Sequence, residues 1–253
     1  MIEIGKPIIE FAPLREGRLI KRYKRFLADV ELDDGEIVTA HCANTGPMKG
    51  VLNIGGNVRL RYVSSPTRKL SWSWEQSEVK IADGSSCWVG VNTTLSNRIV
   101  RLAIEAGYLK DHLGLIKSIR QEVPYGKEKN SRIDFLIDTF PQHKDPRSIY
   151  LEVKNTTWLE QGIAYFPDTI TERGQKHLKE LIYVLPEFRA VLLPCISRSD
   201  AQKFAPGDSA DRDYADLYRM AYRSGVEIIP CCFGFYINKI TWEGTRPFLL
   251  EMQ

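Results

Sequence analysis

The sequence predicts an all-β domain over residues 1–85 followed by an α/β domain over residues 86–253. Three observations lead to this fold class. The first part alternates short extended runs with turn-forming clusters. Apolar residues then recur at helical spacing from about residue 92 onward. With 253 residues, 43% of them hydrophobic, the chain is long enough to bury a core in each of two domains.

The predicted first domain is a small barrel built from five extended runs. The runs are RYKRFLADVEL, EIVTAHC, NVRLRYV, KLSWSWE and EVKIA, and the clusters between them are DDG, NTGPMKG, NIGG and SSPT. Five short strands within 85 residues are typical of a small barrel.

The second domain begins with a helix in NTTLSNRIVRLAIEAG, which Gly107 can end. Three strands follow, in LIKSIRQEVPYG, SRIDFLID and SIYLEVKNTT, and then a helix with an apolar stripe from Leu178 to Leu185. RAVLLPCIS is nearly continuously apolar, which indicates a strand buried on both faces. A third helix before Gly225 and a strand in VEIIPCCF complete the predicted order.

Charge and cysteine content exclude several classes of protein. The net charge of +3 is too small to indicate nucleic-acid binding by itself. The five cysteines contain no C-x-x-C pair, so we predict buried thiols rather than a zinc site or a disulfide framework. Because no apolar run is long enough for a signal peptide or a membrane span, we expect a cytoplasmic protein that does not bind membranes.

Two neighbouring predicted strands carry charged side chains on one face of an otherwise apolar sheet. Residues two apart on a strand share a face, so Glu152 and Lys154 in SIYLEVKNTT point the same way. Asp134 lies in the preceding strand, opposite the apolar positions of SRIDFLID. If residues 139–147 join the two strands as a hairpin, Asp134 comes level with Glu152.

Two carboxylates at close range repel each other unless a cation lies between them, and Mg²⁺ or Mn²⁺ suits such oxygen ligands. We therefore predict a metal site at Asp134 and Glu152, with Lys154 orienting the attacking water or stabilising charge that develops on a phosphate. This is metal-assisted phosphodiester hydrolysis. The alternative is that Glu152 and Lys154 form an ordinary solvated strand face.

The order of elements, with an Asp followed by E-x-K on the next strand, resembles the PD-(D/E)XK nuclease superfamily. That resemblance implies a nuclease-like fold for residues 86–253 and a further catalytic carboxylate on the first helix. Glu105 is the candidate, because it borders the apolar stripe of that helix. Alternatively, Glu105 is a solvated helix residue.

Longer motifs resemble the sugar fermentation stimulation protein A family of prokaryotes over nearly all of the chain. They are RFLADVEL, HCANTGPMKG, NTTLSNRIVRLAIEAG, RIDFLI, YLEVKNTT and FPDTITERGQKHLKEL. The resemblance implies DNA binding, an OB-like domain, a nuclease-like domain and a link to regulation of sugar metabolism, maltose included. The family's acidic positions fall on Asp134 and Glu152 and its lysine on Lys154. Ala43 and Pro47 depart from the proline and serine expected in the second motif.

Basic residues cluster in the first domain despite the small net charge. REGRLIKRYKR holds six basic residues and one acid, and no Asp or Glu occurs from Ile37 to Trp74. Such a stretch attracts phosphates. Tyr62, Trp72 and Trp74 lie within it and could stack on bases, although the tryptophans are more typical of barrel core. The predicted nucleic-acid contacts are Lys21, Arg22, Lys24, Arg25, Arg59, Arg61, Arg68 and Lys69.

A third basic element opens the helix in TERGQKHLKE. Backbone amides at a helix N-terminus favour anions, so we predict phosphate contacts at Arg173 and Lys176. His177 lies beside the apolar stripe, so its position fits a packed helix residue equally well. We favour phosphate contacts at Arg173 and Lys176 over a catalytic role for His177.

These observations predict a DNA-binding protein with a magnesium-dependent nuclease site at Asp134, Glu152, Lys154 and Glu105. Binding is expected to be largely independent of DNA sequence, because no helix-turn-helix pattern is present. Two alternatives stay open. One is a non-catalytic DNA-binding regulator that uses the nuclease fold as a scaffold. The other is an RNA-directed protein, because OB-type barrels accept either nucleic acid.

Overall fold

The first third of the chain forms a six-stranded sheet that closes into a barrel, in a computed structural model that describes residues 4–81, 83–127, 130–141 and 145–251. The strand order is β4-β3-β2-β5-β6-β7, and β4 closes the barrel by pairing in parallel with β6. The barrel confirms the predicted OB-like fold. Its strands are β2 (Arg15–Tyr23), β3 (Leu27–Leu32), β4 (Ile37–His41), β5 (Asn57–Tyr62), β6 (Trp72–Lys80) and β7 (Ser86–Gly90).

The predicted run RYKRFLADVEL is not one strand. It contains the end of β2, a tight turn and the whole of β3, because Lys24 and Arg25 both adopt positive φ angles, 48° and 67°. Such turns usually carry Asn or Gly, so the sequence shows no turn signal here. The two basic residues therefore lie at the tip of a hairpin.

The rest of the chain forms an α/β domain around a mixed sheet of order β1-β17-β16-β13-β10-β9-β8, with β15 beside β13. The β10–β13–β16 core of the sheet is parallel and its outer pairs are antiparallel. The strands are β1 (Pro7–Glu10), β8 (Ile116–Tyr125), β9 (Ser131–Thr139), β10 (Ile149–Thr156), β13 (Arg189–Ile196), β15 (Glu227–Ile228), β16 (Cys231–Phe235) and β17 (Lys239–Thr245).

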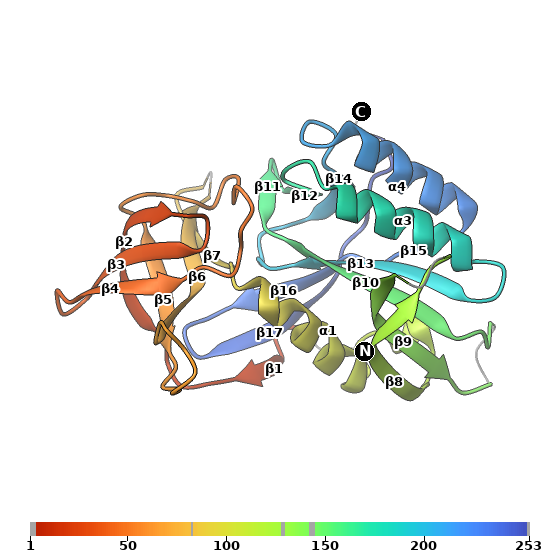
Figure 1. Ribbon diagram of the computed structural model, residues 1–253, viewed down its shortest axis with the longest axis horizontal. Helices are drawn as coiled ribbons and strands as arrows, with labels where there is room; N and C mark the ends of the chain where they lie inside the picture. Colours follow the sequence, from red (N-terminus) through yellow and green to blue (C-terminus); the bar gives the residue numbers. More distant parts are fainter. Residues whose placement is uncertain (1–3, 82, 128–129, 142–144, 252–253) are drawn as a thin grey trace.

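Helices cover both faces of this sheet (Figure 1). Helix α1 (Ser96–Glu105) packs on one face in a cluster with Phe135 and Leu151. Helices α3 (Glu172–Val184) and α4 (Arg212–Ser224) pack on the other face. The predicted order of helix, three strands, helix, strand, helix, strand is therefore confirmed. The structure adds η1 (Thr93–Leu95), α2 (Lys110–Leu113) and a small sheet of β11 (Trp158–Glu160), β12 (Ile163–Phe166) and β14 (Lys203–Pro206).

The boundary between the two domains differs from the predicted one at residue 85. We expected residues 1–85 to form the first domain, but β1 pairs antiparallel with β17 at the edge of the larger sheet. The barrel in turn continues through β7 to Gly90. A strand whose partner lies more than 200 residues further along the chain cannot be assigned from local pattern, which explains the difference.

Direct contacts hold the barrel against the larger domain. The Gly90 amide donates to the Ser197 carbonyl at 2.8 Å, and Gln76 Nε2 donates to the Tyr236 carbonyl at 2.8 Å. Lys49 lies 3.6 Å from the ring centroid of Trp158. Among the described residues, no helix combines the length and the apolar character needed to cross a membrane.

The replacement Gly90→Ala tests this docking. An added Cβ would overlap the aromatic ring of Phe235 on β16. We expect the free energy of unfolding to fall by about 1–3 kcal/mol, the range for overpacking a dense interface. Denaturant unfolding measures the change. The second replacement Phe235→Leu should recover part of the loss in the double variant, and purely additive losses would contradict the assigned contact.

Candidate functional site

The candidate site lies where β9 separates from β10. The two strands pair at Ile149–Ile137, Tyr150–Leu136 and Leu151–Phe135, and their backbone pairing ends at Leu151. The carboxylate of Asp134 then takes the place of a strand carbonyl, because its Oδ2 accepts the Val153 amide at 2.7 Å. The departure of β9 thus frees space beside β10, into which charged side chains project.

Helix α1 fixes the second oxygen of Asp134. Asn97 Nδ2 donates to Asp134 Oδ1 at 2.7 Å, and the neighbouring Ser96 hydroxyl donates to Asn155 Oδ1 at 3.0 Å. Both contacts come from the first turn of α1. The start of this helix therefore orients one acidic residue of the site and holds the end of β10.

Glu152 is the most buried charge of the site, at 3% exposure. Its Oε1 accepts a hydrogen bond from Lys154 Nζ at 2.7 Å and contacts Nδ1 of His177. Lys154 Nζ also lies 3.1 Å from the same histidine nitrogen. Oε2 is buried and has no hydrogen-bond partner within the described part of the chain.

Burial and neighbouring charge give the two carboxyl groups different protonation behaviour. Burial, with the charge of Glu152 adding to it, raises the pKa of Asp134 to about 6, against the opposing hydrogen bonds from Val153 and Asn97. Burial also opposes ionisation of Glu152, but Lys154 and His177 outweigh it and hold the pKa of Glu152 below its ordinary value. Glu152 is therefore ionised more readily than an ordinary glutamate, whereas Asp134 holds its proton to a higher pH than an ordinary aspartate and is mostly ionised at pH 7.

These residues fit a hard divalent cation. A buried carboxylate oxygen without a partner is costly unless something binds it, and the adjacent acid repels Glu152 until a cation lies between them. The described ranges contain no group of three or more His, Cys, Asp or Glu side chains placed to hold a metal. The protein side chains thus offer two ligands, an arrangement that leaves positions for water and substrate oxygen.

The structure brings Asp134, Glu152 and Lys154 together but leaves Glu105 out. Glu105 is exposed at the far end of α1, where it pairs with Arg101 at 2.8 Å. It lies eight residues beyond Asn97, which corresponds to about 12 Å along the helix axis. The prediction of Glu105 as part of the site is therefore corrected, and the residue that α1 contributes is Asn97.

Two residues on α3 were underrated by sequence reasoning. His177 is buried against Glu152 rather than merely packed beside the stripe. Glu180, one turn further, is buried at 8% exposure and accepts the Ser131 hydroxyl at 2.9 Å. The available signal was their position, because both lie among Leu178 and Leu181 on the face that packs against the sheet.

Arg173 and Lys176 lie at the exposed rim of the site. Arg173 Nε is 3.4 Å from His177 Nε2, and Lys176 Nζ donates to Asn130 Oδ1 at 2.6 Å. Lys176 also lies 3.7 Å from Glu180. Both positions suit contact with a phosphate that approaches the buried carboxylates.

Several basic residues of the barrel serve the barrel itself. Arg22 donates to the carbonyl oxygens of Arg25, Asn44 and Gly46 at 2.7–2.9 Å, and Arg25 donates to that of Thr45 at 3.0 Å. These two arginines therefore hold the loop after β4 and are more than surface charges. Lys21 pairs with Asp29 at 3.2 Å.

The other predicted contacts differ in how accessible they are. Arg59 is 11% exposed, pairs with Glu16 at 2.7 Å and stacks on Trp88. Arg61 pairs with Glu75 at 3.3 Å. Arg68 donates to the Ser73 hydroxyl at 2.7 Å and, like Lys24 and Lys69, has an exposed side chain.

The three aromatic residues of this stretch also differ in how accessible their rings are. Trp74 is 1% exposed in the barrel core, as favoured for the tryptophans. Trp72 is partly buried and packs edge-on against Tyr62 at a centroid separation of 5.1 Å. Tyr62 is 58% exposed, which makes it the ring of this group that is accessible to a base.

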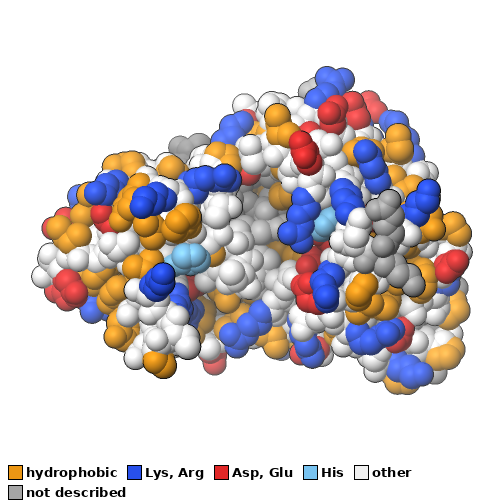
Figure 2. Space-filling model, viewed as in Figure 1, with side chains coloured by type: hydrophobic (Ala, Val, Ile, Leu, Met, Phe, Trp, Pro, Cys, Tyr) orange, Lys and Arg blue, Asp and Glu red, His pale blue; other side chains and the backbone are white. Residues whose placement is uncertain are grey.

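A hollow separates the barrel from the larger domain on the face that Figure 2 shows, with Lys and Arg side chains on both sides of it. Basic charge on two facing walls favours an extended polyanion between them.

Comparisons with known proteins match both halves of the chain. The model of the SfsA N-terminal OB domain matches residues 20–91, and that of the sugar fermentation stimulation protein RE domain matches residues 94–239. A sugar fermentation stimulation protein homolog of Prochlorococcus marinus strain MIT 9313 is 64% identical over 244 residues, covering 96% of this chain and 97% of that protein. The homolog of Synechococcus sp. strain WH7803 is 62% identical over 243 residues, covering 96% of this chain and 95% of that protein.

A solved structure shares the fold. The chain of Pyrococcus furiosus SfsA in complex with Ca²⁺ matches with a TM-score of 0.84 at 24% identity, covering 97% of this chain and 100% of that one. Together the matches confirm the resemblance carried by the sequence motifs.

The raised pKa of Asp134 predicts a pH-dependent stability in metal-free buffer. The folded state keeps this proton up to about pH 6, whereas the unfolded state releases it near 3.8. Stability should therefore fall as pH rises from 4 to 6, by an amount on the order of 2 kcal/mol. The measurement is the free energy of unfolding of the parent minus that of Asp134→Asn at each pH.

Asp138→Asn on the same strand is the matched control. Hydrogen bonds from Ser148 and Ser118 lower the pKa of Asp138, so its contribution is present above pH 4 and is lost as pH falls. The free energy of unfolding of the parent minus that of Asp138→Asn should therefore rise with pH, whereas the difference for Asp134→Asn should fall. A flat difference for Asp134→Asn would contradict the assigned burial of that carboxyl group.

Proposed function

This chain belongs to the sugar fermentation stimulation protein family, and we propose that it is a divalent-metal-dependent nuclease whose catalytic centre is Asp134, Glu152 and Lys154. The observation that carries the proposal is that Oε2 of Glu152 is buried and has no hydrogen-bond partner among the described residues. It lies beside the carboxyl group of Asp134, whose pKa is raised by burial and by the charge of Glu152. The Ca²⁺ complex of the Pyrococcus furiosus relative supports a divalent cation. Mg²⁺ or Mn²⁺ is the proposed cofactor, because both accept carboxylate oxygens and leave positions for a phosphate.

Asp134 and Glu152 would hold the cation, which when bound stabilises charge on the phosphate and lowers the pKa of a water molecule. Lys154 donates to Glu152 Oε1 beside the pair, and it would orient the attacking water oxygen and stabilise the negative charge that grows on phosphorus-bound oxygen. Attack forms one P–O bond and breaks another, and the leaving oxygen takes up a proton. Asn97 and the Val153 amide hold Asp134 in place throughout.

The substrate proposed for this site is nucleic acid bound through its backbone. Lys24 on the hairpin and Lys69 on the β5–β6 loop are exposed, as are the rim residues of α3. Figure 2 shows Lys and Arg side chains on both sides of the hollow between the lobes. Phosphate contacts of this kind position a strand without reading its bases. DNA is the proposed substrate, RNA is the competing one, and matched strands of each distinguish them by affinity and cleavage.

One observation favours a second candidate, a DNA-binding regulator without catalysis. Lys154 and His177 both occupy Oε1 of Glu152, so two side chains already offset part of the charge that a metal would neutralise. In that case the nuclease fold would be a scaffold. A link to the regulation of sugar metabolism, maltose included, fits this candidate as well as the first.

Metal-induced thermal shift tests the site directly. Millimolar Mg²⁺ or Mn²⁺ should raise the melting temperature of the parent, because a ligand that binds only the folded state stabilises it. Asp134→Asn and Glu152→Gln should lose this shift, whereas Glu105→Gln, a change at an exposed acid of the same domain, should keep it. Equal shifts in all four proteins would place the metal elsewhere, and no shift in any of them would favour the regulator.

Lys154→Met separates chemistry from metal binding. The variant keeps both carboxylates and the aliphatic stem of the side chain, so the metal-induced shift should remain. Cleavage of DNA should fall by about 10²–10³-fold, the typical loss when one stabilising group is removed. Cleavage at the parental rate would remove Lys154 from the mechanism.

Salt dependence tests backbone binding. Affinity should fall steeply with salt, and the double variant Lys24→Ala/Lys69→Ala should reduce the slope of log K against log salt by about 0.7–0.9 per lysine, because each phosphate contact releases counterions. The loss should be similar for unrelated DNA sequences. Arg223→Ala, an exposed arginine at the end of α4, is the control and should leave the slope unchanged. A loss restricted to one sequence would contradict a positioning role.

A further inference from the structure

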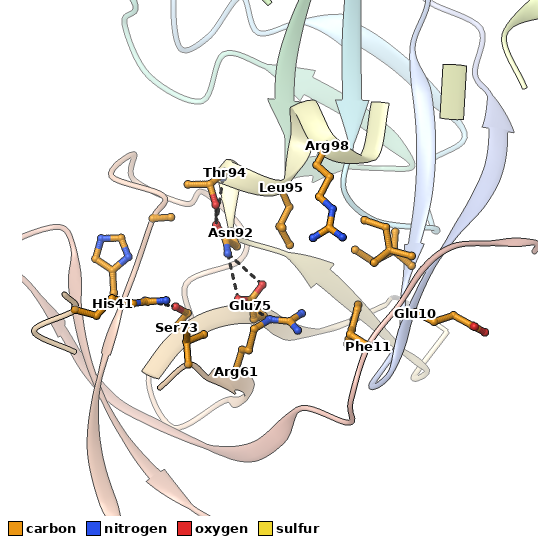
Figure 3. A pocket seen from close by; sticks show the side chains of 15 residues that line it. Glu10, Phe11, His41, Arg61, Ser73, Glu75, Asn92, Thr94, Leu95 and Arg98 are labelled. Atoms are coloured by element: carbon orange, nitrogen blue, oxygen red, sulfur yellow. Dashed lines mark hydrogen bonds and ion pairs between the residues drawn. The ribbon is translucent and has the colours of Figure 1, made fainter. Parts of the chain in front are cut away.

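A cavity of about 470 Å³ lies where the barrel meets the larger domain. Its walls come from β4, β5 and β6, from β1 and the segment that follows it, and from η1 and the first turn of α1 (Figure 3). None of Asp134, Glu152 and Lys154 lines it, so it is separate from the carboxylate pair. Its volume lies within the range of about 300–1,000 Å³ that is usual for small-ligand sites.

The cavity carries an excess of positive charge. Arg61, Arg68 and Arg98 line it from three different segments of the chain. Glu75, the one buried acid of the lining, already has partners within the protein. Asn92 Nδ2 lies 3.1 Å from each of its oxygens, and Arg61 Nε lies 3.3 Å from Oε1. Glu10, the other acid, points away from the interior in Figure 3.

One guanidinium group of the lining, that of Arg98, is left without a compensating charge. Arg98 makes no ion pair with any described residue. Arg68 forms no salt bridge among these residues and donates to the Ser73 hydroxyl at 2.7 Å, although its charge also helps to oppose the rise that burial causes in the pKa of Glu75. Figure 3 shows Arg98 and Arg61 directed toward the same space. A planar guanidinium matches the oxygens of a phosphate with two parallel hydrogen bonds, which makes this group the ligand that the charges suit.

The remaining lining suits the rest of a nucleotide. Phe11 and Leu95 present apolar surface beside the arginines, which can cover a sugar or a base. A free inorganic anion would need neither this surface nor this volume.

The cavity is connected to the candidate nuclease site through α1. Arg98 lines the cavity, and its neighbour Asn97 donates to Asp134. Thr94 and Leu95, in the η1 segment that leads into α1, also line the cavity. The short segment 94–98 therefore lines the cavity through Thr94, Leu95 and Arg98 and contacts Asp134 through Asn97.

We propose that this cavity binds a phosphate group of a nucleotide in the strand that reaches the carboxylate pair, with Arg98 and Arg68 as its contacts. The inference rests on the proposed function, since that function identifies nucleic acid as the ligand. The phosphate is either the terminal phosphate of a strand or one between nucleotides, and both present anionic oxygens that a guanidinium can bind.

The test compares two single-stranded oligonucleotides of one sequence, with a 5′-phosphate and with a 5′-hydroxyl, in buffer containing a chelator so that no cleavage occurs. Arg98→Gln and Arg68→Gln should each weaken binding about tenfold, the effect of losing one charge-assisted contact. A loss confined to the 5′-phosphorylated strand assigns a terminal phosphate, and an equal loss with both strands assigns an internal one. Arg101→Gln, on the same helix but paired with Glu105 outside the cavity, is the control.

Unchanged affinity of both arginine variants for both strands, with normal binding by the parent, would overturn the inference and leave the proposed nuclease intact. So would a loss no larger than that of Arg101→Gln. The metal-induced thermal shift of the parent, measured without nucleic acid, tests metal binding at the carboxylate pair independently of binding at the cavity. A parent that binds neither strand would overturn this inference whatever the metal does.

Discussion

Repulsion between the buried carboxyl group of Glu152 and the half-buried one of Asp134 is the constraint around which the candidate site is arranged. Asp134 and Glu152 face the same space because β9 leaves β10 at this point, and burial makes ionisation of both costly. The surroundings offset the cost unequally. A lysine and a histidine stabilise the charge on Glu152, whereas Asp134 receives hydrogen bonds from the Val153 amide and from Asn97.

The fold places that pair within the larger domain, on β9 and β10. Beyond it, β10 and β13 lead toward the barrel, and the Gly90–Ser197 and Gln76–Tyr236 hydrogen bonds fix the two lobes. The pairing of β1 with β17 then returns the N-terminal segment to the larger sheet. Because the chain crosses between the lobes more than once, the hollow and the cavity between them have walls from both.

Many basic side chains already bind carbonyl or carboxylate groups of the protein itself, so they are less available to bind a phosphate. Arg22 and Arg25 hold backbone carbonyls of a loop, and Arg59 is nearly buried under its partners. The exposed lysines and the arginines of the cavity are more available to a phosphate. A count of basic residues along the chain overstates the binding surface, because a guanidinium with several donors readily serves as a structural link.

The sequence by itself determined the β-barrel, the order of the α/β elements and the shared face of Glu152 and Lys154. All three follow from local periodicity and turn chemistry, which act over a few residues. Asp134 could be placed near them only because a hairpin joins the two strands. Tertiary structure alone decided that β1 joins the last strand, that α1 contributes Asn97 rather than Glu105, and that His177 contacts Glu152. These contacts join residues 25 to more than 200 positions apart, or depend on how a helix is rotated and shifted against the sheet, and packing sets both only after the whole chain has folded.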